Sequence, residues 1–106
     1  MFDPNEDSRR FRVTVDSDLE ELIPGFLENR RNDIQLIKDY LELNDFENIS
    51  GLGHTMKGVG GGYGFDEISE IGWEIEQAAK NHNQEAIEKQ VERLQYYLDH
   101  VQIEWE

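Results

Sequence analysis

Residues 87–105 read IEKQVERLQYYLDHVQIEW. Apolar residues recur in this stretch at alternating steps of four and three: Ile87, Val91, Leu94, Leu98, Val101 and Trp105. An α-helix places residues three and four apart on one face, so the period predicts a long amphipathic helix. The same alternation is typical of helices that pack antiparallel around a shared core. The stretch therefore predicts a helical bundle with Trp105 on its seam.

Three other parts of the chain show helical periodicity. One runs from Leu19 to about Leu43, the second starts near Phe46, and the third spans Ile68 to Ala78. The residues between these segments are typical helix stops and caps: Asn44 with Asp45, Gly64 as a terminator with Asp66 as the next cap, and Asn81 to Asn83. Gly60, Gly61 and Gly62 blur the end of the second helix.

The start of the chain is the least regular part. Ser17 and Glu20 fit a capping box, and Pro24 is expected to open the first long helix after a short helix that ends near Leu22. Residues 1–16 are expected to be a flexible arm, because a short stretch such as Val13 to Val15 makes no sheet alone. The sequence thus predicts an all-α fold, an antiparallel up-down-up-down four-helix bundle over residues 17–106 with a short extra N-terminal helix or arm.

Composition excludes several classes of function. The chain has 106 residues, a formal net charge of −14 and no cysteine. This charge disfavours non-specific binding to nucleic acid or to an anionic membrane, and the absence of cysteine excludes disulfides and thiolate metal sites. With no membrane span or signal peptide apparent, we expect a soluble cytoplasmic domain, and a monomer since no dimerisation helix is left over.

Residues 52–65, LGHTMKGVGGGYGF, carry the chemically informative pattern. On a helix, the apolar residues of this region gather on one side, and His54 falls on the opposite side. Spacing alone leaves two interpretations open, an incidental surface histidine or one presented for chemistry. Lys57, Gly58 and Gly61 share the face of His54, and helical glycines cost about 1 kcal/mol each relative to alanine. That cost favours a histidine on a face cleared for another protein, beside a lysine that can meet an anion.

The motif His54-Thr-Met-Lys57-Gly58, followed six residues later by Gly64, resembles the signature of histidine-containing phosphotransfer domains. The resemblance covers roughly residues 17–105 and departs from the family at Gly60 to Gly62, where many members have Ser, Ala or Asn. It implies that His54 accepts a phosphoryl group from the aspartyl phosphate of a response-regulator receiver domain and passes it to another receiver.

The resemblance also implies roles for the neighbours of His54. Lys57 would screen the phosphoryl charge, Gly58 would leave room for it, and Gly64 would support the turn that ends the helix. The family often places a polar side chain of the next helix near the histidine, and Glu76 is the best-placed candidate.

Cofactors and partners follow from the same resemblance. We expect no cofactor or metal on this chain and no kinase activity, with Mg²⁺ held by the receiver. The partners are receiver domains, with a hybrid histidine kinase system as a further setting. The start at Met1 and the coverage by one domain favour a stand-alone protein.

The residues also bear on three other functions. A phosphate-binding loop is disfavoured because Lys57 precedes the glycines and no strand leads into them. A metal site is disfavoured because His82 and His100 are not spaced with His54 as ligands. A non-catalytic helical adaptor that only binds a signalling partner stays open as the alternative. Its candidate contacts are Phe2, Trp73, Tyr96, Tyr97 and Trp105, although aromatic residues at helical spacing are more often core, Trp105 above all.

Overall fold

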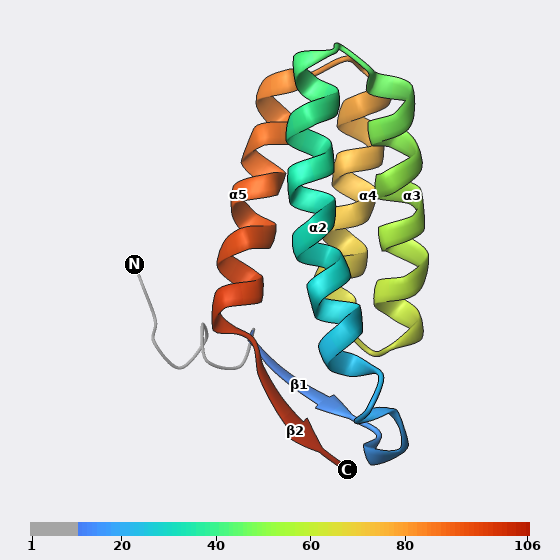
Figure 1. Cartoon of the computed structure of the whole chain (residues 1–106), viewed down its shortest axis with the longest axis vertical. Helices are drawn as coiled ribbons and strands as arrows, with labels where there is room; N and C mark the ends of the chain where they lie inside the picture. Colours follow the sequence, from blue (N-terminus) through green and yellow to red (C-terminus); the bar gives the residue numbers. More distant parts are fainter. Residues whose placement is uncertain (1–10) are drawn as a thin grey trace.

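The computed structural model describes residues 11–106 and is a four-helix bundle. The long helices are α2 (Ile23–Glu42), α3 (Phe46–Gly62), α4 (Asp66–Lys80) and α5 (Gln84–His100), preceded by the short 3-10 helix η1 (Ser17–Leu19). Figure 1 shows the four long helices side by side, joined by short turns. The predicted all-α up-and-down bundle is confirmed.

The turns between helices use the residues that the sequence indicates. Asn44 and His82 adopt positive φ angles of 53° and 51°, and Gly64 has φ of 88°, so each reverses the chain at the end of a helix. The side chain of Asp45 caps α3 by accepting from the Asn48 amide. The expected cap by Asp66 is wrong, because Asp66 is the first residue of α4 and Phe65 precedes it without a side-chain cap.

The chain enters α2 through a break before Pro24, as predicted, but without the predicted capping box. Pro24 lies in the first turn of α2, where its missing N–H costs nothing, so the predicted break before it is confirmed. The capping box of Ser17 and Glu20 does not form. Instead Asp16 caps η1 by accepting from the Asp18 amide.

A small parallel sheet replaces the expected arm over part of its length. β1 (Arg12–Val15) pairs with β2 (Gln102–Trp105) at one end of the bundle (Figure 1). The two strands run in the same direction, and η1 turns the chain back toward α2 after β1 has ended. Val13 and Val15 are buried beneath the bundle, so residues 12–15 belong to the fold. Phe2, Arg9 and Arg10 of the expected arm lie outside the described residues.

The last helix is shorter than the apolar period predicts. α5 ends at His100, and Val101 begins an extended segment that leads into β2. Trp105 therefore pairs with Val15 in the sheet, and 42% of its surface is exposed. Its expected place on the helical seam is wrong.

The core is made mainly of β-branched and aromatic side chains from all four helices. Fully buried members are Ile23, Ile37, Ile49, Met56, Phe65, Ile68, Ile71, Ile75, Ile87 and Leu94. Burying each such side chain contributes about 1.5–3 kcal/mol relative to an exposed one. Helices α3 and α4 thereby become a rigid platform for the residues on their outer face.

Glycines set the distance between α3 and α4. A Cβ atom built on Gly53 would lie 2.7 Å from the backbone N of Glu76, and one on Gly60 would lie 2.7 Å from the backbone N of Ser69. On the opposing helix, a Cβ on Gly72 would lie 2.5 Å from the backbone N of Lys57. Backbone atoms cannot give way as a flexible side chain does, so the two helices meet at a spacing that only glycine permits.

We predict that Gly72→Ala destabilises the fold by about 1–3 kcal/mol, since the added methyl group forces α3 and α4 apart. Gly51→Ala is the matched control. Gly51 is exposed on α3 with open space around its Cβ position, so alanine should stabilise by about 0.5–1 kcal/mol through helix propensity alone. Urea unfolding followed by circular dichroism measures both. Equal stability changes in the two variants would contradict the close helix contact.

Candidate functional site

His54 lies near the middle of α3 and points away from the core. Its side chain is 73% exposed, whereas Gly53 and Met56 on the same helix are buried. The predicted orientation of the imidazole is confirmed. Because the ring stands on a helix held by a packed core, its position is fixed even though its surface is open to solvent.

Glu76 of α4 holds the imidazole from the side. Its Oε2 atom lies 3.1 Å from Nδ1 of His54 and 3.5 Å from Nζ of Lys80, so one oxygen serves both partners. Glu76 itself is only 7% exposed. A buried carboxylate needs such partners, because removal from water without compensation is costly.

This contact determines which ring nitrogen is available. A carboxylate oxygen only accepts hydrogen bonds, so Nδ1 of His54 carries the proton and donates it to Glu76. In the neutral ring the lone pair is then on Nε2, the nitrogen away from α4. The geometry therefore leaves Nε2 as the ring nitrogen that Glu76 does not hold, on an exposed side chain.

Lys57 and Gly58 lie one turn beyond His54 and are both exposed. The carbonyl of Lys57 accepts from the Ser69 hydroxyl at 2.7 Å, which ties this turn of α3 to α4. Within residues 11–106, the Lys57 ammonium has no ion-pair partner. Among the described residues it is thus an unpaired positive charge on the His54 side of the helix.

The glycines near His54 divide into two groups. Gly58 and Gly62 face open space within the described part of the chain, and Gly61 lies at the edge, 3.8 Å from Ser69 Oγ as measured from a built Cβ. Gly60 is buried against α4, as is Gly53. The expectation that the glycine run serves only a visiting surface needs correction, because part of it serves helix packing.

Gly64 has the structural position that the resemblance implied for it. Its positive φ ends α3, and its amide donates to the carbonyl of Gly61 at 3.1 Å. A residue with a Cβ would be strained in this conformation.

A shallow hollow of about 470 Å³ adjoins the site. It is lined by Lys57 from α3 and by Asp66, Ser69, Glu70 and Trp73 from α4. Trp73 is 44% exposed, so the expectation that the tryptophans are core does not hold for it. A large aromatic side chain left open beside an exposed histidine is a typical element of a contact surface.

Lys80 was missed in the sequence, and Trp73 was named there only as a candidate contact of an adaptor. Lys80 follows Glu76 by four residues on α4, and this Glu-to-Lys spacing is a recognisable helical ion pair. Trp73 precedes Glu76 by three residues, which places both on neighbouring parts of the same helix face. Helical spacing from Glu76 would have identified both.

Other candidate residues lie apart from His54. Arg30 is buried and bonds Asp33 at 2.8 Å, where burial raises the pKa of the Asp33 carboxyl against the opposing effect of Arg30. Arg31 donates to Asp99 and so joins α2 to α5. Arg30 is therefore not part of the solvated face of α2.

The two other histidines are engaged elsewhere. His82 stacks on Phe46 with ring centroids 4.6 Å apart, and His100 stacks on Tyr96 at 4.0 Å. Across residues 11–106, no cluster of three or more His, Asp or Glu side chains is placed to hold a metal ion.

A family model described as the Hpt domain matches residues 11–104. The chain belongs to the Hpt domain family. Hpt domains are phosphotransfer modules of two-component signalling that lack kinase activity of their own and interact with response-regulator receivers. The match includes β1 and most of β2, so the small sheet lies within the Hpt region. No curated protein and no solved structure matches the chain.

Over the described residues, no helix of this Hpt domain is both long enough and apolar enough to cross a bilayer.

We predict that Glu76→Ala changes the tautomer of His54, because Nδ1 loses the acceptor that keeps it protonated. The ¹⁵N chemical shifts of the two ring nitrogens measure the change, with the Nε2–H form expected to increase. Glu76→Gln should retain the Nδ1–H form, since its amide oxygen still accepts. Glu74→Ala, an acidic residue of α4 outside this contact, is the control. Unchanged shifts in Glu76→Ala would contradict the assignment of the proton to Nδ1.

Proposed function

We propose that this Hpt domain is a phosphorelay intermediate. His54 accepts a phosphoryl group from the aspartyl phosphate of a receiver domain and passes it to another receiver. The observation that carries the proposal is the exposed imidazole whose Nδ1 is held by the buried carboxylate of Glu76, which leaves Nε2 free. The free cation of Lys57 beside it supports the same chemistry.

The transfer step is a displacement at phosphorus. The Nε2 lone pair attacks the phosphorus atom, an N–P bond forms, and the P–O bond to the aspartyl oxygen breaks, so that the receiver regains an aspartate carboxylate. The ring becomes formally cationic while Nδ1 keeps its proton, and the Glu76 carboxylate stabilises that charge. Reversal of the same step onto a second receiver returns His54 to its neutral form.

Lys57 compensates the charge that the transfer brings. A phosphoryl group adds negative charge to a chain whose formal net charge is already −14. The Lys57 ammonium has no competing partner among the described residues, so it is available to the phosphoryl oxygens. Because Gly58 has no side chain, the space above the helix next to Lys57 stays open.

Docking of the receiver has to align its phosphoryl group with His54. His54 stands on a surface with no enclosing pocket, and phosphoryl transfer depends mainly on positioning and charge neutralisation. We expect the receiver to cover Trp73 and the open glycines and to supply the acidic pocket with its Mg²⁺. The net charge of −14 makes long-range attraction to an acidic pocket unfavourable, so apolar and shape contacts should carry the docking.

We predict that a phosphorylated receiver with Mg²⁺ labels the wild-type chain and that His54→Gln abolishes the label. Phosphate on histidine is acid-labile and alkali-stable, which identifies the product. His100→Gln, a change at another exposed histidine, should label as the wild type does. If His54→Gln is labelled equally, the proposed acceptor is wrong. If a receiver binds but no variant is labelled, the chain is an adaptor that only binds.

We predict that Lys57→Ala slows the transfer by about 10- to 100-fold, the loss of one charge-assisted hydrogen bond of about 1.5–3 kcal/mol in the transition state. Single-turnover transfer from a phosphorylated receiver measures the rate. Lys89→Ala on α5 removes the same charge far from His54 and should leave the rate unchanged. Thermal unfolding should show both variants folded, and an unfolded Lys57→Ala would instead make Lys57 structural.

A further inference from the structure

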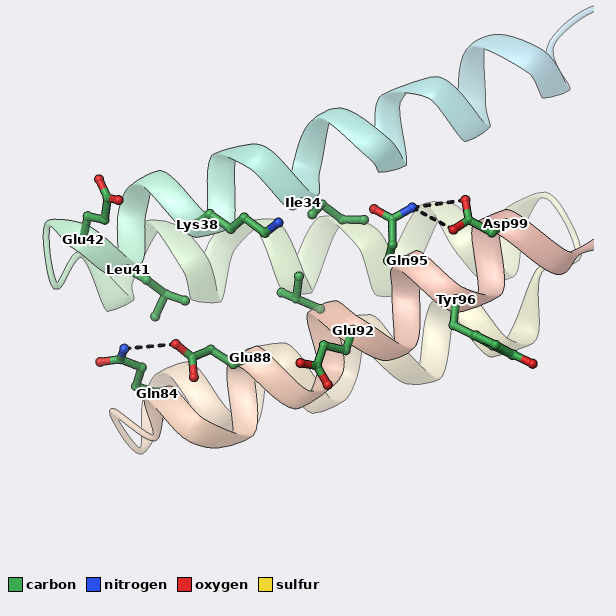
Figure 2. Close-up of a pocket in the computed structure, with 11 residues that line it drawn as sticks. Ile34, Lys38, Leu41, Glu42, Gln84, Glu88, Glu92, Gln95, Tyr96 and Asp99 are labelled. Carbon is green, nitrogen blue, oxygen red and sulfur yellow. Dashed lines mark hydrogen bonds between the residues drawn. The ribbon is translucent and has the colours of Figure 1, made fainter. Parts of the chain in front are cut away.

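The face formed by α2 and α5 carries a groove of about 740 Å³ (Figure 2). All of its lining residues come from these two helices, whereas His54 and Glu76 belong to α3 and α4. The floor is apolar and includes Ile34 and Leu41 of α2 and Val91 of α5. The groove is therefore separate from the site described above.

The edges of the groove are acidic. Glu42 of α2 and Glu88, Glu92 and Asp99 of α5 line it, and Lys38 is the one cation among its lining residues. Asp99 is neutralised by Arg31 at 3.0 Å. Glu42, Glu88 and Glu92 form no salt bridge within residues 11–106, so one lysine, Lys38, faces these three carboxylates and offsets their repulsion only in part. A positively charged ligand would remove that repulsion.

The length and direction of the groove match a helix. Its lining on α5 extends from Gln84 to Asp99, which corresponds to about 22 Å at 1.5 Å per residue. These residues recur along one face of α5, and the α2 residues Ile34 to Glu42 face them (Figure 2). A ligand lying along the groove would meet apolar floor along its length and carboxylates on both sides.

We propose that this groove binds a basic amphipathic helix of about four turns from a protein partner. The apolar face of that helix packs on the half-buried Leu41 and the exposed Tyr96, above the nearly buried Ile34 and Val91, and its Lys or Arg side chains reach Glu42, Glu88 and Glu92. A second copy of this chain fits poorly, because each copy carries a net charge of −14. An enclosed small-molecule site also fits poorly, because the polar lining side chains are exposed at the edges and not buried within the groove.

The position of the groove has a consequence for signalling. A helix bound between α2 and α5 leaves the outer face of α3 and α4 uncovered. The partner that supplies the basic helix can therefore stay bound while His54 meets a receiver. The proposal does not depend on phosphotransfer by His54 and can be tested without it.

The probe is a fluorescently labelled 16-residue peptide with leucines on one helical face and lysines on the other. Fluorescence anisotropy with the full chain should give saturable binding that weakens as salt concentration rises. Glu88→Gln/Glu92→Gln should weaken binding about fivefold to tenfold, the loss of two charge contacts. Glu21→Gln/Glu28→Gln changes the net charge equally outside the groove and should have little effect.

Three results would overturn the proposal. Equal binding of a peptide of the same composition but scrambled order would show that only net charge attracts it. Equal weakening in the two double glutamine variants would show the same. Binding that appears only after removal of residues 1–10, which include Arg9 and Arg10, would make the chain's own basic segment the occupant. Amide shift changes confined to α2 and α5 in an NMR titration, with the His54 amide unaffected, would support the groove.

Discussion

The backbone contact between α3 and α4 is the constraint on which the site depends. Gly53 lies directly before His54, and it is the point where a Cβ would collide with the backbone of Glu76. Without that contact α4 would lie farther away, and a carboxylate on its surface would not reach the imidazole. The glycines that cost helix stability are thus the reason that the Glu76 oxygen lies 3.1 Å from Nδ1 of His54.

The same glycine-rich helix performs two functions on two faces. Inward-facing Gly53 and Gly60 let α4 approach, while outward-facing Gly58 and Gly62 leave space beside His54. Each helix position faces either α4 or solvent, so the close approach of α4 and the open space beside His54 depend on different glycines. Both requirements call for glycine, which explains why a stretch of such low helix propensity stands in the middle of a packed bundle. Tertiary packing with α4 compensates for that low propensity.

The periodicity of apolar residues was sufficient to predict the four helices, because packing of amphipathic faces dominates their stability. It failed at the two ends of the chain. Val101 and Trp105 are four residues apart, and a step of four also keeps residues on one face of a strand, so the pattern could not separate helix from strand there. The partner strand, Arg12–Val15, lies at the other end of the sequence, and no local pattern reveals such a pairing.

Helical spacing predicted the orientation of the site, whereas the contact of Glu76 with the imidazole was expected only from the resemblance to the family. Spacing placed His54 and Lys57 on the exposed face, and the helix crossing brings Glu76 to the ring, with Lys80 as a second partner of the Glu76 carboxylate. The charged side chains also differ between the α3–α4 face and the α2–α5 face. Among the described residues Lys57 forms no salt bridge, and it lies on the His54 face in a hollow that it shares with Asp66 and Glu70, while Glu42, Glu88 and Glu92 line the α2–α5 groove. A chain of net charge −14 thus presents a lysine on the His54 face, with three carboxylates that form no salt bridge among the described residues on the opposite pair of helices.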